Sequence, residues 1–194
     1  MNTDPSRLDG DELLHLALQA SQKGESENAI EYLKRALEVS SNKAIVHYLL
    51  GAEYAQIGMH DRAIQEMGSA ISQDPSLLAA QFQLGLLHLV NAHVSDAISS
   101  WQSLDKLGED NPFFLFKTGL IHLANDEFDK CLTYLRQGIA TNTSNPALNQ
   151  DMQLIIDQVT SSHNPPVPES IKLNDSDQQA SGHVFISAYT DAKT

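Results

Sequence analysis

The sequence predicts an all-α fold in which about four helix pairs stack side by side. Two observations predict it: an internal repeat of 34 residues, and two amphipathic helical patterns inside each repeat. The repeat is visible in three columns of residues, each keeping the 34-residue step without a gap. The columns are Ala17, Gly51, Gly85 and Gly119; Ala29, Ala63, Ala97 and Cys131; and Leu33, Met67, Trp101 and Leu135. Three independent columns at one period indicate a repeat protein.

The second repeat displays its two helices most clearly. Apolar residues recur at spacings of three and four between positions 45 and 55, which places them on one face of a helix. Gly58 supplies a helix end. A second stripe runs from 63 to 71, and Pro75 closes the unit where it can start the next helix. Small residues are expected where the helices cross, because axes about 8–10 Å apart leave little room for a side chain.

The same pattern, followed along the chain, predicts nine helices. They cover residues 10–22, 26–39, 43–57, 60–73, 77–90, 94–107, 112–124, 127–141 and 147–160. Asp9 and Glu12 have the spacing of a capping box at the start of the first helix. The last helix has an apolar stripe opposite a polar face, which is typical of the helix that caps a stacked array.

The expected organisation is an N-terminal segment, four repeats, a capping helix and a tail. The ranges are 1–9, 10–43, 44–77, 78–111, 112–145, 146–161 and 162–194. The tail begins with HNPPVPESIKLNDSDQQASG, whose prolines and polar residues predict an extended linker. It continues into HVFISAY at 183–189, a short apolar segment with the character of a strand.

The repeats resemble the tetratricopeptide repeat. The second unit carries residue types that this motif prefers at Leu50-Gly51, Tyr54, Ala63, Met67, Ala70 and Pro75, and the third carries them at Leu84-Gly85, His88, Ala97 and Trp101. The resemblance covers about residues 10–145. It implies a right-handed superhelix in which the first helix of each pair lines the inner surface. The third and fourth units depart from the motif: Leu104 replaces a small residue, Thr118, Cys131 and Gly138 are atypical, and Pro146 comes late. These departures together predict altered packing between the third and fourth units.

Composition argues against several partner classes. The formal net charge is −13, with 12 basic and 25 acidic side chains, so nucleic-acid phosphates and anionic lipids would be repelled. One cysteine permits no internal disulfide and no cysteine-based metal cluster. The start MNTDPSRLDGDELL lacks the features of a signal peptide, and no window approaches about 18 uninterrupted apolar residues. We therefore expect no membrane insertion and a cytoplasmic location.

No catalytic signature is present, and neither an enzyme, a cofactor nor a metal site is expected. The motifs GxSxG, GxxxxGK, HExxH and CxxC are all missing. His88 and His122 occupy the place of Tyr54 in successive units, which predicts packed imidazoles with local hydrogen bonds. His88 and His93 lie five apart across a helix end, a poor ligand spacing on this interpretation. Cys131 stands at a packed position and is expected to be an inert buried thiol.

The resemblance assigns an apolar inner surface to the first helices. Its columns comprise Leu14, Leu18, Ile45, Tyr48, Ala52, Phe82, Leu86, Leu89, Phe113, Phe116, Leu120 and Leu123. Many repeats of this family bind an acidic peptide C-terminus through lysine and asparagine at such positions, and neither residue type occurs here. The columns predict a groove for an extended apolar peptide segment. The competing interpretation is that the stripe is core, covered by tight closure of the superhelix.

The heptad of the tail is a candidate occupant of that groove. Val184, Phe185, Ile186 and Tyr189 are its large apolar residues. The linker from about 161 to 182 spans up to ~65 Å when extended, enough to return to the inner face of its own chain or a neighbour's.

The primary hypothesis is a non-enzymatic protein–protein interaction module or adaptor. One alternative is a cytoplasmic chaperone for a secreted or membrane-destined client. Another is a self-assembling subunit, a homo-oligomer linked through its tail.

Overall fold

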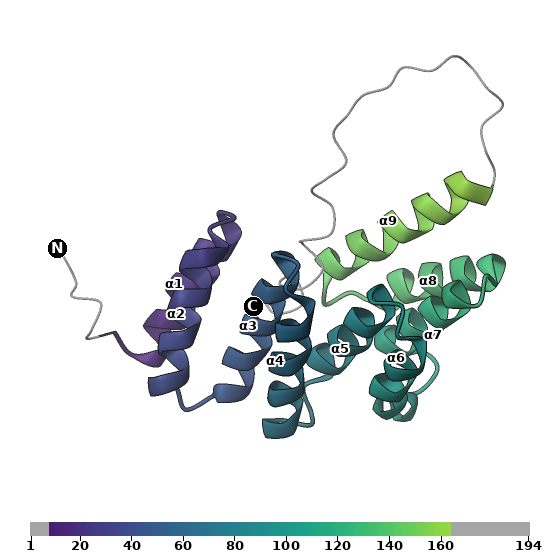
Figure 1. Cartoon of the computed structure of the whole chain (residues 1–194). Helices are drawn as coiled ribbons and strands as arrows, with labels where there is room; N and C mark the ends of the chain where they lie inside the picture. Colours follow the sequence, from purple (N-terminus) through teal and green to yellow (C-terminus); the bar gives the residue numbers. More distant parts are fainter. Residues whose placement is uncertain (1–7, 164–194) are drawn as a thin grey trace, which may run out of the picture.

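The computed structural model describes residues 8–163, and this part of the chain is helical with short connections. The helices are α1 (Gly10–Gln22), α2 (Ser26–Val39), α3 (Lys43–Gln56), α4 (His60–Gln73), α5 (Leu78–Val90), α6 (Val94–Trp101), α7 (Pro112–Ala124), α8 (Phe128–Thr141) and α9 (Pro146–His163), with a 3-10 helix η2 (Gln102–Leu107) after α6. Figure 1 shows the pairs following one another from α1–α2 to α7–α8, and α9 packs against α8. The all-α prediction is confirmed.

The main departure from the predicted helices is in the third pair. The helix expected over 94–107 ends at Trp101 and continues as η2. Leu104 lies in η2 and is fully buried, at the repeat position that Ala36, Ala70 and Gly138 occupy in the other pairs. We attribute the change to this side chain, because a regular helix would direct an isobutyl group into space sized for a methyl group or a hydrogen.

The break in α6 alters the junction with the fourth pair, as the sequence predicts. Helix α7 packs against α5, α6 and η2 together. The ammonium group of Lys117 on α7 is buried and pairs with the carboxylate of Asp105 in η2. A charge-assisted hydrogen bond thus ties η2 to the next pair.

Each pair turns through the same backbone motif. The residues Gly24, Gly58, Ala92 and Asp126 have positive φ angles of 75°, 75°, 61° and 58°. In each turn the next residue donates its N–H to a carbonyl five positions back: Glu25 to Ala20, Met59 to Tyr54, His93 to His88 and Glu127 to His122, at 2.8–2.9 Å. This is the Schellman arrangement. In the third and fourth turns the side chains of the two bonded residues lie beside each other, as the His88–His93 ring contact and the His122–Glu127 hydrogen bond show.

Small residues inside each pair allow the two helices to approach. A Cβ atom added to Gly85 on α5 would lie 2.1 Å from Nε1 of Trp101 on α6. The indole N–H of Trp101 donates to the carbonyl oxygen of Phe82 at 2.9 Å, and its ring stacks on Phe82 with centroids 5.9 Å apart. The indole therefore fills the space that the missing side chain leaves.

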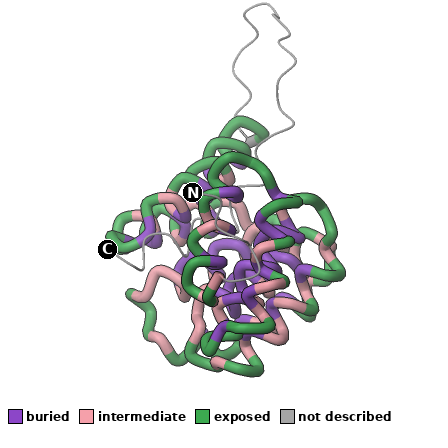
Figure 2. The backbone as a smooth tube through the Cα atoms, turned by 90° about the vertical axis from the view of Figure 1, so that its left-hand side faces the viewer, coloured by how far each residue is buried: buried purple, intermediate pink, exposed green. Residues whose placement is uncertain are grey.

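The buried side chains form two apolar clusters that meet within α5. Ala80 and Leu87 belong to the cluster of the first two pairs, whereas Phe82 and Leu86 belong to that of the last two pairs and α9. Figure 2 shows buried residues gathered along the interior of the stack and exposed residues around its outside. Opposite faces of α5 thus serve the two halves of the molecule.

The junction of the first two pairs encloses a carboxyl group. Glu53 on α3 is 2% exposed, and its Oε2 atom has no hydrogen-bond partner in the described part of the chain. Burial raises the pKa of this carboxyl, and the neighbouring Ser21 and Ser26 hydroxyls offset only part of the increase. A small cavity of about 10 Å³ beside it is lined by Ala17, Leu18, Ser21, Leu33, Leu49 and Glu53.

Replacing Gly85 by alanine should destabilise the fold although alanine is the better helix former. Overpacking against the indole should lower the free energy of unfolding by about 1–3 kcal/mol, measured by urea denaturation. Gly68→Ala on α4 is the matched control: nothing lies within 4 Å of its added Cβ. That change should stabilise the protein by about 0.5–1 kcal/mol. Equal effects at the two sites would contradict the packing argument.

Replacing Glu53 by glutamine should raise the free energy of unfolding at neutral pH and flatten its pH dependence. The folded-state pKa lies above the ordinary value of 4.5. Between these two values the folded protein binds more protons than the unfolded chain, so wild-type stability falls as the pH rises through this window. Urea unfolding of both proteins at a series of pH values measures the difference. Glu31→Gln, which removes a carboxylate at an exposed position of α2, is the control and should change the free energy of unfolding at neutral pH by less than about 0.5 kcal/mol.

Candidate functional site

The residues predicted to line a peptide groove all lie on α1, α3, α5 and α7. Seven are buried, namely Leu14, Tyr48, Ala52, Phe82, Leu86, Phe116 and Leu120. Five are half-buried, namely Leu18, Ile45, Leu89, Phe113 and Leu123, and we call these the half-buried apolar set. All four first helices contribute to the set. The predicted columns therefore lie at two depths, with a buried layer and a layer that water still reaches.

Aromatic contacts connect the third pair to the fourth within these columns. Phe82 on α5 packs against Trp101 on α6 and against Phe113 and Phe116 on α7, with centroids 5.5 and 6.4 Å away for the two phenylalanines. Phe116 also lies against Gly138 of α8, whose added Cβ would come within 2.4 Å of the ring. Phe82 and Phe116 are thus structural supports of this junction. Phe113 packs against them while remaining half-buried.

The remaining predicted positions belong to the tail. Val184, Phe185, Ile186 and Tyr189 lie outside the described residues. Their docking on the first helices stays a prediction.

Burial shifts the pKa of two further side chains within the helix pairs, Cys131 and Tyr48. Burial raises the pKa of the Cys131 thiol to about 11, so the thiol is protonated at neutral pH and is a poor nucleophile. The expected burial of Cys131 is confirmed, and its lack of reactivity stays a prediction. Burial also raises the pKa of the Tyr48 hydroxyl above its ordinary value of 10.0. Both shifts have the same cause, because a low-dielectric interior disfavours the charged form of each group.

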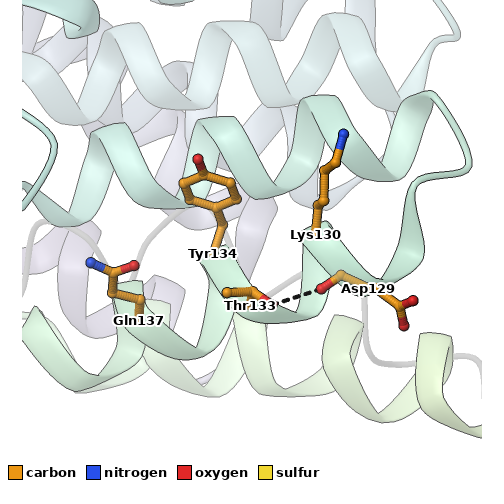
Figure 3. A pocket seen from close by; sticks show the side chains of 5 residues that line it. All are labelled: Asp129, Lys130, Thr133, Tyr134 and Gln137. Atoms are coloured by element: carbon orange, nitrogen blue, oxygen red, sulfur yellow. Dashed lines mark hydrogen bonds between the residues drawn. The ribbon is translucent and has the colours of Figure 1, made fainter.

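A surface hollow of about 320 Å³ lies on α8, and no pattern in the sequence indicated it. Figure 3 shows its lining, which comprises Asp129, Lys130, Thr133, Tyr134 and Gln137. The Thr133 hydroxyl donates to the backbone carbonyl of Asp129 at 2.8 Å. These positions belong to the exposed face of a second helix, and a periodicity search assigns such residues to solvent. Their mixed polarity and single-helix origin favour a solvated depression over a built ligand site.

The histidines predicted to be equivalent have different surroundings. His122 forms a hydrogen bond with Glu127, and its ring stacks on Tyr134 with centroids 5.3 Å apart. This matches the expected packed imidazole with a local hydrogen bond. His88 differs, since its buried Nδ1 atom has no hydrogen-bond partner within residues 8–163.

The interpretation of the His88–His93 spacing as poor for ligands is wrong. Their candidate ligand atoms and an oxygen of Asp96 all lie within 4.8 Å of one another. The chain reverses at Ala92, so a separation of five residues brings the two imidazoles together. Linear spacing along a helix does not account for this reversal.

No helix within residues 8–163 has the length and apolar content needed to cross a bilayer.

Comparison with known proteins finds a repeat family and relatives that contain similar sequence. A tetratricopeptide repeat family model matches residues 13–43 and 44–77. Lipopolysaccharide assembly protein B of Escherichia coli K12 is 26% identical over 129 residues, which cover 62% of this chain and 33% of that protein. The chain thus spans about a third of the length of the curated relatives it matches.

Solved structures share the fold at low sequence identity. TTC0263 of Thermus thermophilus, described as a thermophilic TPR protein, has a TM-score of 0.66 at 16% identity, covering 80% of this chain and 83% of that one. MamA from Desulfovibrio magneticus RS-1 has a TM-score of 0.57 at 13% identity, covering 82% and 97%. The resemblance to the tetratricopeptide repeat is therefore confirmed: two repeats match the family model, and the helix pairs that follow continue the same fold.

Proposed function

We propose that the chain is a non-enzymatic protein–protein interaction module that binds an extended apolar segment along its first helices. The tetratricopeptide-repeat fold supports an interaction module in general. The finer proposal depends on one observation, the half-buried apolar set, to which every first helix contributes. Fully burying a large apolar side chain is worth about 1.5–3 kcal/mol. A partner that completed the burial of this set would gain several such partial contributions.

The chemistry of these positions favours an apolar ligand over an acidic one. Leu14, Leu18, Tyr48 and Ala52 occupy the places where repeats of this family carry lysine and asparagine for a peptide carboxylate. Only Leu18 of these four is half-buried, and the half-buried apolar set contains no lysine or asparagine that could pair with a carboxylate. The chain as a whole is acidic, with a formal net charge of −13, which would repel an acidic peptide. A neutral or basic segment with alternating large apolar side chains is the partner that fits.

The chain's own tail supplies a segment of that kind. The heptad at 183–189 contains Val184, Phe185, Ile186 and Tyr189, and about 20 residues separate it from the end of α9. A linker of this length sets an effective concentration on the order of millimolar. Even a weak contact would then be substantially populated. The tail would act as a built-in competitor in its own chain, or as a link between copies in a homo-oligomer.

The same apolar surface would serve a chaperone that shields a secreted or membrane-destined client. Lipopolysaccharide assembly protein B is, by its name, an assembly factor. This similarity supports a chaperone as the second candidate function. The two functions differ in selectivity. An adaptor binds one defined segment, whereas a chaperone protects many apolar clients from aggregation.

Amide hydrogen exchange across residues 183–189 of the full chain tests the tail as the occupant. We expect protection in the wild type and its loss in the double variant Leu89→Gln, Leu123→Gln, because these residues occupy equivalent repeat positions in the half-buried apolar set. The control is Ile98→Gln, at an apolar residue of α6 that is 46% exposed, and it should retain the protection. Free-chain exchange in the wild type would contradict the tail as the occupant.

Titration with the synthetic heptad HVFISAY and with unrelated apolar heptads tests the groove itself. If the surface binds apolar segments, the double variant should lose affinity by about tenfold, while Ile98→Gln should not. Equal affinity of wild type and double variant for every peptide would contradict the proposed surface. Suppression of client aggregation by the wild type, without preference among heptads, would favour the chaperone over the adaptor.

A further inference from the structure

The four turns within the helix pairs bring together the same three repeat positions. Two are the residues joined by the Schellman hydrogen bond, and the third lies three residues further on, in the first turn of the second helix. The four trios are Ala20, Glu25 and Asn28; Tyr54, Met59 and Arg62; His88, His93 and Asp96; and His122, Glu127 and Lys130. Because the backbone motif is shared, these trios can be compared directly.

Three of the trios contain complementary partners. In the first turn the Asn28 amide donates to Glu25 at 3.2 Å. In the second, the guanidinium group of Arg62 lies 5.6 Å from the centroid of the Tyr54 ring.

The fourth turn contains the same kind of internal pairing. Glu127 accepts hydrogen bonds from both His122 and Lys130, the latter at 3.0 Å. The positions thus approach closely enough for their side chains to interact in pairs.

The third trio differs from these, since it contains two imidazoles and one carboxylate. The two rings have centroids 6.4 Å apart, and one candidate ligand atom from each of the three residues lies within 4.8 Å of the others. The Nδ1 atom of His88 is buried and has no hydrogen-bond partner among the described residues. The turn therefore contains hydrogen-bonding capacity that this part of the chain leaves unused.

We propose that His88, His93 and Asp96 bind a divalent first-row transition-metal ion, with Zn²⁺ as the type case, at the α5–α6 turn. Imidazole nitrogen and carboxylate oxygen are preferred zinc ligands, and His-x₄-His falls within the spacing of known sites. Ligand atoms around a tetrahedral zinc ion lie about 3.3 Å apart, given bonds of about 2.0–2.1 Å. His93 and Asp96 are exposed and can rotate to close the remaining gap.

The donor set selects among cations. Mg²⁺ and Ca²⁺ require mostly oxygen ligands, whereas imidazole nitrogens favour zinc, nickel and copper. Three protein ligands leave the fourth position of a tetrahedral ion to water. The ion would join the last turn of α5 to the first turn of α6, and binding would therefore stabilise the third helix pair against unfolding.

Isothermal titration of the full, untagged, chelator-treated chain with ZnCl₂ tests the proposal. We expect one equivalent of Zn²⁺ to bind, with a rise in the midpoint of thermal unfolding. His93→Gln and Asp96→Asn should each weaken binding by at least about tenfold, the loss that even second-shell changes produce at metal sites. The ring nitrogen signals of His88 and His93 should shift on titration in NMR spectra. A large excess of Mg²⁺ should not displace the bound ion.

The fourth turn supplies matched controls. His122→Gln removes the equivalent imidazole from a trio that contains Lys130, and it should leave Zn²⁺ binding unchanged. Asp96→Lys recreates that lysine in the third turn and should abolish binding, while circular dichroism reports whether the fold is retained. Absence of Zn²⁺ binding to the wild type would overturn the proposal. So would binding that persists in both His93→Gln and Asp96→Lys.

Discussion

The close approach of the two helices within each pair is the constraint on which the rest of the structure depends. Glycine at positions 51, 85 and 119 faces a large side chain of the partner helix, and the fit is tightest between Gly85 and Trp101. With that contact in place the indole N–H donates to the carbonyl of Phe82 and the indole stacks on the Phe82 ring, which in turn contacts Phe113 and Phe116 of the next pair. The packing of the first helices, and with it the position of their apolar surface, thus depends on Gly85 having no side chain.

The chain reversal within each pair also determines which side chains lie close together. One backbone motif brings three side chains together four times, and the identity of those side chains decides what each turn can do. The same backbone turn carries four different arrangements. The first turn has a hydrogen-bonded amide, the second a guanidinium over an aromatic ring, the third a cluster of potential metal ligands and the fourth a carboxylate shared by two donors. Because the backbone is repeated, the chemistry of each turn is set by its own side chains.

The 34-residue period was sufficient to predict the order of the helices and most of their limits. It also indicated, through Leu104, that the packing after the third unit would differ, although not that the helix would become a 3-10 turn. Periodicity predicts which face of a helix a residue lies on, but not how deeply the residue is buried. Tyr48 and Leu18 were therefore both predicted to line the groove, although only Tyr48 is fully buried. The proximity of His88 and His93 depends on the left-handed backbone at Ala92, which a search for helical spacing does not detect.

The division of the apolar interior inside α5 has a consequence for folding cooperativity. In a linear array the stability is approximately the sum of each repeat's own contribution and of its interfaces with its neighbours, and here the boundary between the two apolar clusters falls within α5. The first two pairs and the last two pairs with α9 can therefore act as separate cooperative units, with opposite faces of α5 belonging to each. Opening of one unit would strip one face of α5 while the other stays packed, so this helix would remain folded for as long as either unit does.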